Sequence, residues 1–367
     1  MSDIKLEKFC STNRSMGERP PDYPNGWIPV LESQDLKPNQ TKPVSAFGYE
    51  LVVFRGPSGA VHVIDAFCPH LGAHLGIAAK VGKGRCGNDC ITCPFHGWQF
   101  RASDGQCTLI PNLNDNEINT INAKLTVWRC IERNDVIYVW HHYDGADPHW
   151  EPDIISQIED KQWQCVARTE YSIDCHIQEI EENWTDMAHF PAVHVPLFYP
   201  YDQLSWWQDL LQRSISFNIR TNWTTVNEPE PYNAMASIDA LTTVFGYDTW
   251  AMNFQFKQVG PATLVISYES PLAGGVSGAL IQYVNPVAPN KLRFILRNYC
   301  SQGFRSRIFA KVLNYFELFM IERDMIIWNN KRFIKTARYT KLDRPIVKFR
   351  RWYSQFYADK NYNVLDW

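Results

Sequence analysis

Two short cysteine–histidine motifs constrain this chain of 367 residues more than any other feature of its sequence. Cys68-Pro69-His70 is followed, after a gap of 22 residues, by Cys93-Pro94-Phe95-His96. Each motif offers one thiolate and one imidazole at short spacing. Two such pairs, carried by adjacent hairpin loops, can bind a metal centre together. The sequence therefore predicts a metal site with two cysteine and two histidine ligands in the N-terminal part of the chain.

A mixed ligand set of this kind has two interpretations. Structural zinc sites usually group like with like, as Cys-x2–4-Cys followed by His-x3–5-His. Here each loop contributes one cysteine and one histidine, which favours a Rieske [2Fe–2S] cluster with thiolates on one iron and imidazoles on the other. We therefore expect the cluster to be held by four side chains, Cys68, His70, Cys93 and His96. Cys86 and Cys90 leave open a rival zinc set with Cys93, and we interpret them as loop thiols.

The pattern around these motifs is that of a small β domain. Short apolar runs at Leu51–Phe54, Val61–Ile64 and Val136–Trp140 predict strands, and the turn pair Ser58-Gly59 separates two of them. A single core rarely grows much beyond about 250–300 residues, so two domains are expected. We predict an N-terminal segment (residues 1–24), a β domain (25–145) and a second domain (146–367).

The second part of the chain mixes strands and helices. Residues 215–219 alternate as in a half-buried strand, and apolar runs at 264–268, 280–284 and 292–296 continue that pattern around a turn at Pro289-Asn290. A long helix is predicted from about Phe304 to Phe333, with an apolar stripe at every fourth residue, namely Phe304, Ile308, Val312, Phe316 and Met320. The predicted fold class of the whole chain is α+β.

A second candidate metal site lies in Glu182-x3-Asp186-x2-His189-x4-His194. A helix predicted from Glu179 to Phe190 would place Asp186 and His189 on one face. Pro191 would end that helix and let His194 turn back towards His189. Two imidazoles beside a carboxylate suit Fe(II). Taken alone, these residues leave open the alternative of a helix end with two ordinary histidines.

The long helix offers a third ligand. Asp324 falls four residues after Met320 and continues the apolar stripe, where a carboxylate is costly to bury unless it is paired or bound to a metal. Arg323 is expected to pair at the surface. The predicted iron ligands are His189, His194 and Asp324, a facial triad that leaves open positions on the metal. Asp186 is then expected to hydrogen-bond the outer nitrogen of a ligating histidine and fix its orientation.

Composition narrows the function further. The net charge of −3 does not indicate a nucleic-acid binder. The chain has no apolar run of about 18 residues and no signal-peptide core, so we expect no transmembrane helix in it and a reducing compartment, where ten cysteines are ligands or buried thiols. Lys331 to Arg351 holds nine lysines and arginines against Asp343 alone. That segment is either a solvated face or a docking surface for an acidic redox partner or anionic lipid.

Together these motifs resemble the Rieske non-haem iron oxygenases and, more closely, the cholesterol 7-desaturases of the Neverland type. The resemblance covers roughly Pro21 to the C-terminus. The blocks that carry it are Tyr23-Pro24-Asn25-Gly26-Trp27, Leu51-Val52-Val53-Phe54-Arg55-Gly56, Cys68 to Gly76, Cys93 to Trp98, Glu322-Arg323-Asp324 through Lys331, and Arg350-Arg351-Trp352-Tyr353-Ser354-Gln355-Phe356-Tyr357.

The resemblance implies a helix-grip-like catalytic domain after the cluster domain, and the same cluster and iron ligands as above. It implies a homotrimer in which the cluster of one subunit feeds the iron of its neighbour through an acid matching Asp186. Electrons would come from NAD(P)H through a separate reductase or ferredoxin, and with O2 as co-substrate cholesterol would become 7-dehydrocholesterol.

The sequence carries Gly82-Lys83-Gly84-Arg85-Cys86-Gly87, but we interpret this glycine motif as a loop between ligand motifs and not as a dinucleotide site.

Two departures from the family pattern bear on the substrate and location. The gap between the ligand motifs is longer than usual, and the membrane helix with which members often begin is not found. We therefore expect a cytoplasmic protein, or one bound peripherally to the endoplasmic reticulum membrane. A sterol or steroid hydroxylase with another apolar substrate is the first alternative, because both outcomes use the same ligands. A Rieske electron-transfer or zinc module without catalysis is the second.

Overall fold

The computed structural model describes residues 20–85, 87–194, 205–225, 231–270, 275–334, 337–357 and 365. The chain forms two compact units. The N-terminal unit comprises Asn25–Asp160 and Asn285–Pro289, and the C-terminal unit comprises Met1–Pro24, Lys161–Val284 and Asn290–Trp367. The domain boundaries predicted at residues 24 and 145 stay a prediction. None of the helices in the described residues is long and apolar enough to span a membrane.

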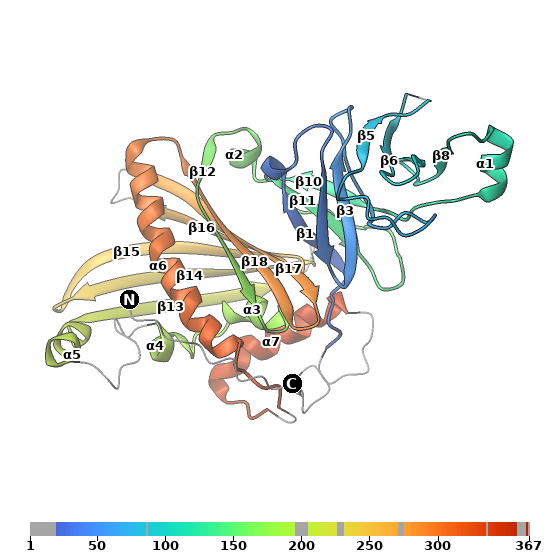
Figure 1. Cartoon of the computed structure of the whole chain (residues 1–367). Coiled ribbons are helices and arrows are strands. Elements are labelled where there is room, and N and C mark those ends of the chain that lie inside the picture. Colours follow the sequence, from blue (N-terminus) through green and yellow to red (C-terminus); the bar gives the residue numbers. More distant parts are fainter. Residues whose placement is uncertain are drawn as a thin grey trace. The chain divides into compact units, whose positions relative to one another are not determined.

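The N-terminal unit is built from three small antiparallel sheets, as the sequence predicted (Figure 1). The first has the order β1-β11-β10, with β1 Gly26–Glu32, β11 Val136–His141 and β10 Cys130–Arg133. The second has the order β2-β3-β4-β9, with β2 Thr41–Ala46, β3 Tyr49–Arg55, β4 Val61–Asp65 and β9 Val127–Trp128. The third has the order β5-β6-β7-β8, with β5 Lys80–Lys83, β6 Asp89–Thr92, β7 Gln99–Arg101 and β8 Cys107–Leu109. The helices α1 (Asp115–Ile121) and α2 (Ser156–Glu159) complete the unit.

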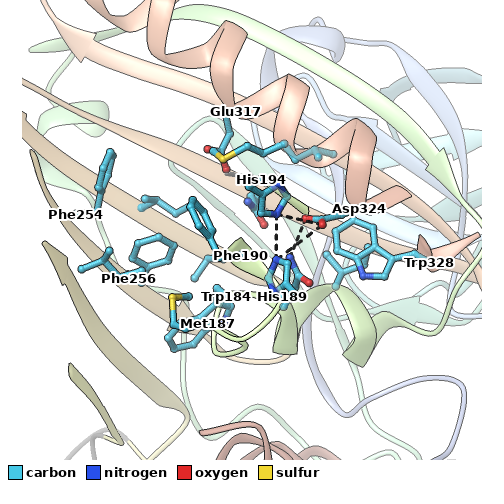
Figure 2. A pocket seen from close by; sticks show the side chains of 18 of the residues that line it. Trp184, Met187, His189, Phe190, His194, Phe254, Phe256, Glu317, Asp324 and Trp328 are labelled. Atoms are coloured by element: carbon cyan, nitrogen blue, oxygen red, sulfur yellow. Dashed lines mark hydrogen bonds and ion pairs between the residues drawn. The ribbon is translucent and has the colours of Figure 1, made fainter. Parts of the chain in front are cut away.

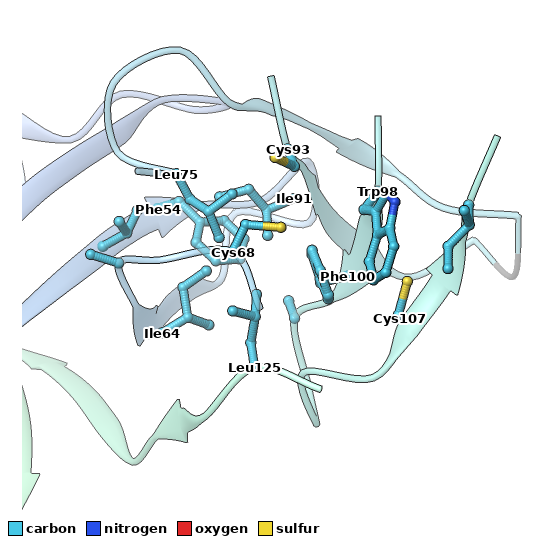
Figure 3. Packing of buried hydrophobic residues seen from close by; sticks show 14 of the residues in the cluster. Phe54, Ile64, Cys68, Leu75, Ile91, Cys93, Trp98, Phe100, Cys107 and Leu125 are labelled. Atoms are coloured by element: carbon cyan, nitrogen blue, oxygen red, sulfur yellow. The ribbon is translucent and has the colours of Figure 1, made fainter. Parts of the chain in front are cut away.

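An apolar core lies beneath the two cysteine–histidine loops (Figure 3). Phe54, Ile64 and Phe100 are fully buried in it, and Cys68 and Cys93 belong to the same cluster. Removing such side chains from water is the main favourable term in folding, at about 25 cal/mol per Å² of apolar surface. The core therefore holds the two thiol-bearing loops against a packed base.

The C-terminal unit contains a seven-stranded antiparallel sheet of order β12-β18-β17-β16-β15-β14-β13. Its strands are β12 Trp163–Ile173, β13 Ile215–Thr225, β14 Asn233–Val244, β15 Tyr247–Val259, β16 Thr263–Ser270, β17 Val276–Ala288 and β18 Lys291–Ser301. The predicted strands and the turn at Pro289-Asn290 are confirmed, and Asn290 adopts a positive φ of 53° in that turn. The α+β fold class is confirmed.

Helices cover this sheet. They are α3 Ile177–Asn183, α4 Phe190–Val193, α5 Trp206–Arg213, α6 Phe304–Trp328 and α7 Arg344–Tyr353. The long helix α6 contacts β12 and β18 and lies across the sheet (Figure 1). It begins at the predicted residue and ends before the predicted Phe333. Contacts also join α4 to α6 and α3 to α7, so the two short helices are fixed between long elements.

The predicted apolar stripe on α6 is wrong for its first four residues, whereas its fifth, Met320, lines the cavity. Phe304, Ile308, Val312 and Phe316 are all exposed, whereas Asp324 is buried. With 3.6 residues per turn, each step of four residues advances about 40° around the helix, so a series of such steps winds away from its starting face. The face that looks into the unit is instead carried by Glu317, Met320 and Asp324. Asp324 is thus buried on the same face as Met320, as predicted.

The helix predicted from Glu179 to Phe190 is present only as far as Asn183. α3 ends at Asn183, and the Thr185 hydroxyl donates to the Glu182 carbonyl at 2.7 Å just beyond that end. Pro191 lies in the first turn of α4, where its missing N–H has no helical partner to lose, and so it does not terminate a helix. Asp186 and His189 consequently lie in the connection between two helices and do not share a helix face.

Candidate active site

His189 and His194 flank the single turn of α4, and Asp324 approaches them from α6 (Figure 2). The two Nε2 atoms are 3.0 Å apart. Asp324 Oδ1 lies 3.2 Å from His194 Nε2 and 3.9 Å from His189 Nε2. Among the described residues, these three form the one group of histidine, cysteine or acidic side chains whose donor atoms all lie within 4.8 Å of one another. The three predicted iron ligands therefore meet at one point.

This arrangement fits a metal ion. At metal–ligand distances of about 2.1 Å, two ligands at a right angle are separated by about 3.0 Å. The distance between the two Nε2 atoms, 3.0 Å, matches that separation. The chemistry of the donors also fits, since two imidazoles and one carboxylate form the ligand set of non-haem Fe(II) oxygenases. A mononuclear iron is the group that this donor set suits.

Asp186 lies behind His189, but the expected hydrogen bond to the outer nitrogen of that ring is not formed. Its Oδ2 atom is 3.5 Å from His189 Nδ1, while its Oδ1 atom accepts a hydrogen bond from the Ala188 amide at 3.0 Å. Burial opposes ionisation of both side chains. The attraction between the two opposite charges outweighs this effect of burial. The pKa of Asp186 is therefore lowered, and the pKa of His189 is raised, with a further contribution from the negative charge of Asp324. Asp186 can therefore orient His189 through its charge.

Two supporting contacts were not foreseen from the sequence. Asn183 Nδ2 donates to Asp324 Oδ2 at 2.9 Å, which holds the carboxylate in place. Arg323 was predicted to pair at the surface, but it is buried and donates through Nη1 to the Val193 carbonyl at 2.9 Å. It thereby ties α6 to α4. Both contacts join residues more than a hundred positions apart, so no local pattern could have indicated them.

Two ion pairs anchor α3 beneath the site, and one of them is fully buried. Arg350 Nε and Nη2 each lie 2.8 Å from a carboxylate oxygen of Glu182, and both side chains are nearly inaccessible. Lys331 pairs with Glu179 one turn earlier. Glu182, which the sequence grouped with the candidate ligands, therefore pairs with Arg350 and does not join the three metal-binding side chains. Lys331 and Arg350, at the two ends of the basic segment, are paired with acids in the unit.

The three side chains close one end of an apolar cavity of about 170 Å³. Aromatic and methionine side chains line much of its wall, among them Met187, Phe190, Phe254 and Phe256 in Figure 2. Phe294 and Met320 belong to the same lining. Trp184 also lines the cavity, and its indole Nε1 donates to Gln258 Oε1 at 3.1 Å. The arrangement can hold a hydrocarbon against a metal ion while keeping bulk water away.

In the N-terminal unit, the two cysteine–histidine loops share one backbone design. The Gly72 amide donates to the Cys68 carbonyl at 2.9 Å, and the Gly97 amide donates to the Cys93 carbonyl at 3.1 Å. Both glycines adopt a positive φ, 72° and 74°, which lets each loop turn back beneath its histidine. Each loop therefore presents a cysteine and a histidine from a turn closed by its own hydrogen bond.

The geometry of the four side chains suits a cluster better than a single zinc ion. Cys68 and Cys93 are buried, and burial together with the neighbouring Cys93 thiol raises the pKa of Cys68 to about 11. The His70 and His96 rings are 4.7 Å apart and lie further out. Among the described residues, no three of these donors converge within 4.8 Å, as tetrahedral zinc would require. Cys86, from the rival zinc set, lies outside the described residues, and Cys90 is buried against Gly84.

The glycine motif at residues 82–87 is not followed by a helix. Its first residues belong to β5, which pairs antiparallel with β6. A dinucleotide-binding motif requires a strand, the glycine turn and then a helix whose N-terminus binds the pyrophosphate. The interpretation of this segment as part of a loop therefore agrees with the described structure.

Comparison with known proteins agrees with both halves of this description. Residues 26–130 match the Rieske [2Fe-2S] domain, and residues 139–357 match the 3-ketosteroid 9alpha-hydroxylase C-terminal domain. Cholesterol 7-desaturase of Caenorhabditis elegans is 35% identical over 96% of this chain and 81% of its own length. Cholesterol 7-desaturase nvd of Xenopus laevis is 34% identical over 100% of this chain and 80% of its own.

Solved structures support the fold as well. Pseudomonas putida CBB5 NdmB superimposes with a TM-score of 0.64 at 18% identity, covering 89% of each chain. At that identity the likeness concerns the fold alone. The matches to both domain families, taken with the full-length similarity to the two desaturases, establish that this chain belongs to the Rieske non-haem iron oxygenases.

Proposed function

We propose that this protein is a sterol-oxidising Rieske oxygenase that converts cholesterol to 7-dehydrocholesterol by 7,8-desaturation. It uses O2 and takes electrons from NAD(P)H through a separate reductase or ferredoxin. The observation that carries the proposal is the apolar, aromatic-walled cavity that ends at His189, His194 and Asp324. The two relatives named above as cholesterol 7-desaturases support the choice of substrate.

In this proposal each metal site has its own residues. Cys68, His70, Cys93 and His96 bind the [2Fe–2S] cluster, and His189, His194 and Asp324 bind the mononuclear iron. The iron, when bound, supplies the chemistry that activates O2 beside the substrate. Asp186 keeps the His189 ring oriented, and Asn183 does the same for the Asp324 carboxylate. The cavity walls exclude water and place the hydrocarbon to be oxidised near the metal.

Electron delivery between subunits is part of the same proposal. A homotrimer would bring the cluster of one subunit to the iron of its neighbour, with Asp186 between them. The outward His70 and His96 are surrounded by exposed apolar side chains, among them Leu71 and Phe95, which would favour such a contact. We place the protein in the cytoplasm or at the periphery of the endoplasmic reticulum membrane, where its substrate resides.

Sterol binding requires some rearrangement of the cavity. A volume of about 170 Å³ lies below the roughly 300–1,000 Å³ of common small-molecule sites. Met187 and Met320 line the cavity, and methionine adapts its shape more readily than other apolar residues because its side chain is unbranched. We expect these two side chains to move when the substrate enters.

Hydroxylation is the second candidate outcome. It is favoured by the match of residues 139–357 to the 3-ketosteroid 9alpha-hydroxylase C-terminal domain. Desaturation and hydroxylation need the same ligands and differ in whether a second hydrogen is lost or oxygen is incorporated.

The test is product analysis. Purified protein with iron and cluster is incubated with a surrogate ferredoxin and reductase, NADH, O2 and cholesterol, and the products are identified by mass spectrometry. The proposal predicts a product lacking two hydrogens, with label lost from cholesterol deuterated at carbons 7 and 8. A product that has gained one oxygen would instead establish the hydroxylase. No oxidation of any sterol in a panel would refute the proposal.

A further inference from the structure

Two polar side chains outside the metal-binding group line the apolar cavity. They are Glu317 on α6 and Gln282 on β17. Other polar groups of the lining have partners, since Asn183 donates to Asp324 and Trp184 donates to Gln258. In the part of the chain that the structure describes, no hydrogen bond is formed by the carboxyl group of Glu317 or by the amide group of Gln282.

Glu317 and Gln282 are half-buried, and a substrate that fills the cavity would remove water from the carboxyl group and the amide. Buried polar groups are nearly always hydrogen-bonded, because losing water without gaining another partner costs free energy. Burial, together with the charge of Asp324, raises the pKa of Glu317 to about 7. Substrate that offers a matching polar group would satisfy both side chains, so the cavity is shaped for a ligand that is apolar except at one point.

The position of Glu317 relative to the metal site suits such a ligand. Glu317 and Asp324 are seven residues apart on α6, which is close to two full turns and about 10 Å along the axis. Both side chains project from α6 towards the cavity (Figure 2). Gln282 enters from the sheet, where it pairs in register with Leu264, another residue of the lining. Both polar side chains therefore line the same cavity as the metal-binding side chains.

We propose that Glu317 and Gln282 form a subsite that binds a hydroxyl group of the substrate. The inference rests on the proposed sterol-oxidising function and specifies which sterols are accepted. A hydroxyl group can donate to the Glu317 carboxylate and accept from the Gln282 amide at the same time. In cholesterol the hydroxyl on carbon 3 is the sole polar group, and it lies at the far end of two fused rings from carbon 7. The subsite would hold that end while carbon 7 faces the metal.

The subsite also predicts a preference against ketones. Above pH 7, where Glu317 is mostly ionised, a keto oxygen can accept a hydrogen bond from Gln282 but has no proton to donate to the Glu317 carboxylate, which repels it. Sites that hydrogen-bond a substrate hydroxyl discriminate strongly against analogues that lack it, because their polar groups are left unpaired. The enzyme should therefore prefer 3-hydroxysterols to 3-ketosteroids, unlike the relatives whose domain name refers to a 3-ketosteroid.

The experiment measures the dissociation constants of cholesterol and cholest-4-en-3-one for the iron- and cluster-loaded protein without O2. Three variants are compared with the wild type, namely Glu317→Gln, Glu317→Leu and Gln282→Leu. The control is Glu322→Gln, an exposed carboxylate on the same helix whose Oε1 accepts from the Tyr171 hydroxyl outside the cavity. Thermal melting and iron content establish that each variant is folded and loaded.

The wild type should bind cholesterol at least tenfold more tightly than the ketone. Glu317→Leu and Gln282→Leu should each weaken cholesterol binding about tenfold or more, while ketone binding changes less, and Glu317→Gln should reduce the preference without loss of stability. The control should match the wild type. If cholesterol is bound and oxidised but the variants leave its preference over the ketone unchanged, the subsite is refuted and the proposed function stands. If the wild type neither binds nor oxidises any sterol, both are refuted.

Discussion

The two candidate metal sites of this protein are built in different ways. In the N-terminal unit, each cysteine–histidine pair lies within one short loop, and each loop is closed by its own backbone hydrogen bond from Gly72 or Gly97. In the C-terminal unit, His189 and His194 meet Asp324 of α6 through packing between elements far apart in the chain. The first site is a product of local sequence, and the second is a product of the tertiary fold.

This difference predicts how each site should fail. A substitution in a loop should disturb its own ligand pair, because the loop conformation depends mainly on contacts within the loop. A substitution far from the iron ligands should still disturb the mononuclear site, because Asn183 joins α3 to α6, Arg323 joins α6 to α4, and Glu182 joins α3 to Arg350 of α7. The predictions below test that contrast, from the largest expected effect to the smallest.

Removing one ligand should empty one site and spare the other. Asp324→Ala should abolish product formation and remove the mononuclear iron, while the absorption and electron paramagnetic resonance spectra of the cluster remain. Cys93→Ser should remove the cluster and leave the mononuclear iron. Metal analysis should therefore fall from about three irons per chain to about two in the first variant and about one in the second.

The contrast between the sites would be broken if Asp324→Ala also lost the cluster spectrum. Retained activity in Asp324→Ala would remove that residue from the proposed ligand set. Glu322→Gln, which changes a neighbouring exposed carboxylate, serves as the matched control and should behave as the wild type.

Breaking the buried ion pair should destabilise the C-terminal unit. Arg350→Met leaves Glu182 charged and buried, which typically costs about 3–5 kcal/mol. Urea unfolding followed by tryptophan fluorescence should show this loss, together with weaker retention of the mononuclear iron and an unchanged cluster spectrum. The double variant Glu182→Leu/Arg350→Met should recover most of the stability, because no unpaired charge remains. Equal losses in the single and double variants would contradict the ion-pair explanation.

Neutralising Asp186 should weaken the mononuclear site without emptying it. In Asp186→Asn the side-chain oxygen can still accept from the Ala188 amide, but the negative charge beside His189 Nδ1 is lost. Changes of this kind behind a metal ligand typically reduce metal affinity or activity about 10- to 100-fold. Activity should fall in this range with the cluster spectrum unchanged. Asp209→Asn, in an exposed pair with Arg213, should have no effect, and equal losses in both variants would exclude a specific role for Asp186.

Glycine substitutions should give the smallest effects and stay within the cluster loops. Gly72 and Gly97 both have a positive φ, but their surroundings differ. A Cβ atom added at Gly97 would lie 3.1 Å from the Pro111 ring, whereas a Cβ atom added at Gly72 would have no other atom within 4 Å. Gly72→Ala should cost about 1–2 kcal/mol through backbone strain alone, and Gly97→Ala somewhat more. Thermal melting and the rate of cluster loss measure both, and no change in the mononuclear iron is expected. A larger effect at Gly72 than at Gly97 would contradict this explanation.

The sequence predicted the locally encoded features well. The strands around residues 51–54, 61–64 and 136–140 are present, as is the turn at Pro289-Asn290. The three residues proposed as iron ligands do lie together, although their metal-binding role and that of the cluster residues stay a prediction. The spacing of residues in the sequence predicted structure correctly where the conformation of a loop or strand is determined by its own residues.

The errors arose where several local patterns fit the same residues. Pro191 was interpreted as a helix terminator, but proline is equally suited to the first turn of a new helix, where it is found. Apolar residues at every fourth position on α6 were interpreted as one face, although such a series winds around the helix. Asn183 and Glu317 were missed because their roles depend on what packs opposite them, and a single sequence carries no signal for that.

The central claim is that one chain holds iron in two separate places, with the residues named above. The most direct test is an anomalous difference map, measured at the iron absorption edge, from a crystal of the iron- and cluster-loaded protein. We predict one peak between His189 Nε2, His194 Nε2 and Asp324 Oδ1, and a second, stronger peak between the Cys68–Cys93 thiols and the His70–His96 rings. A zinc signal at the second position, or no iron within coordinating distance of Asp324, would contradict the account.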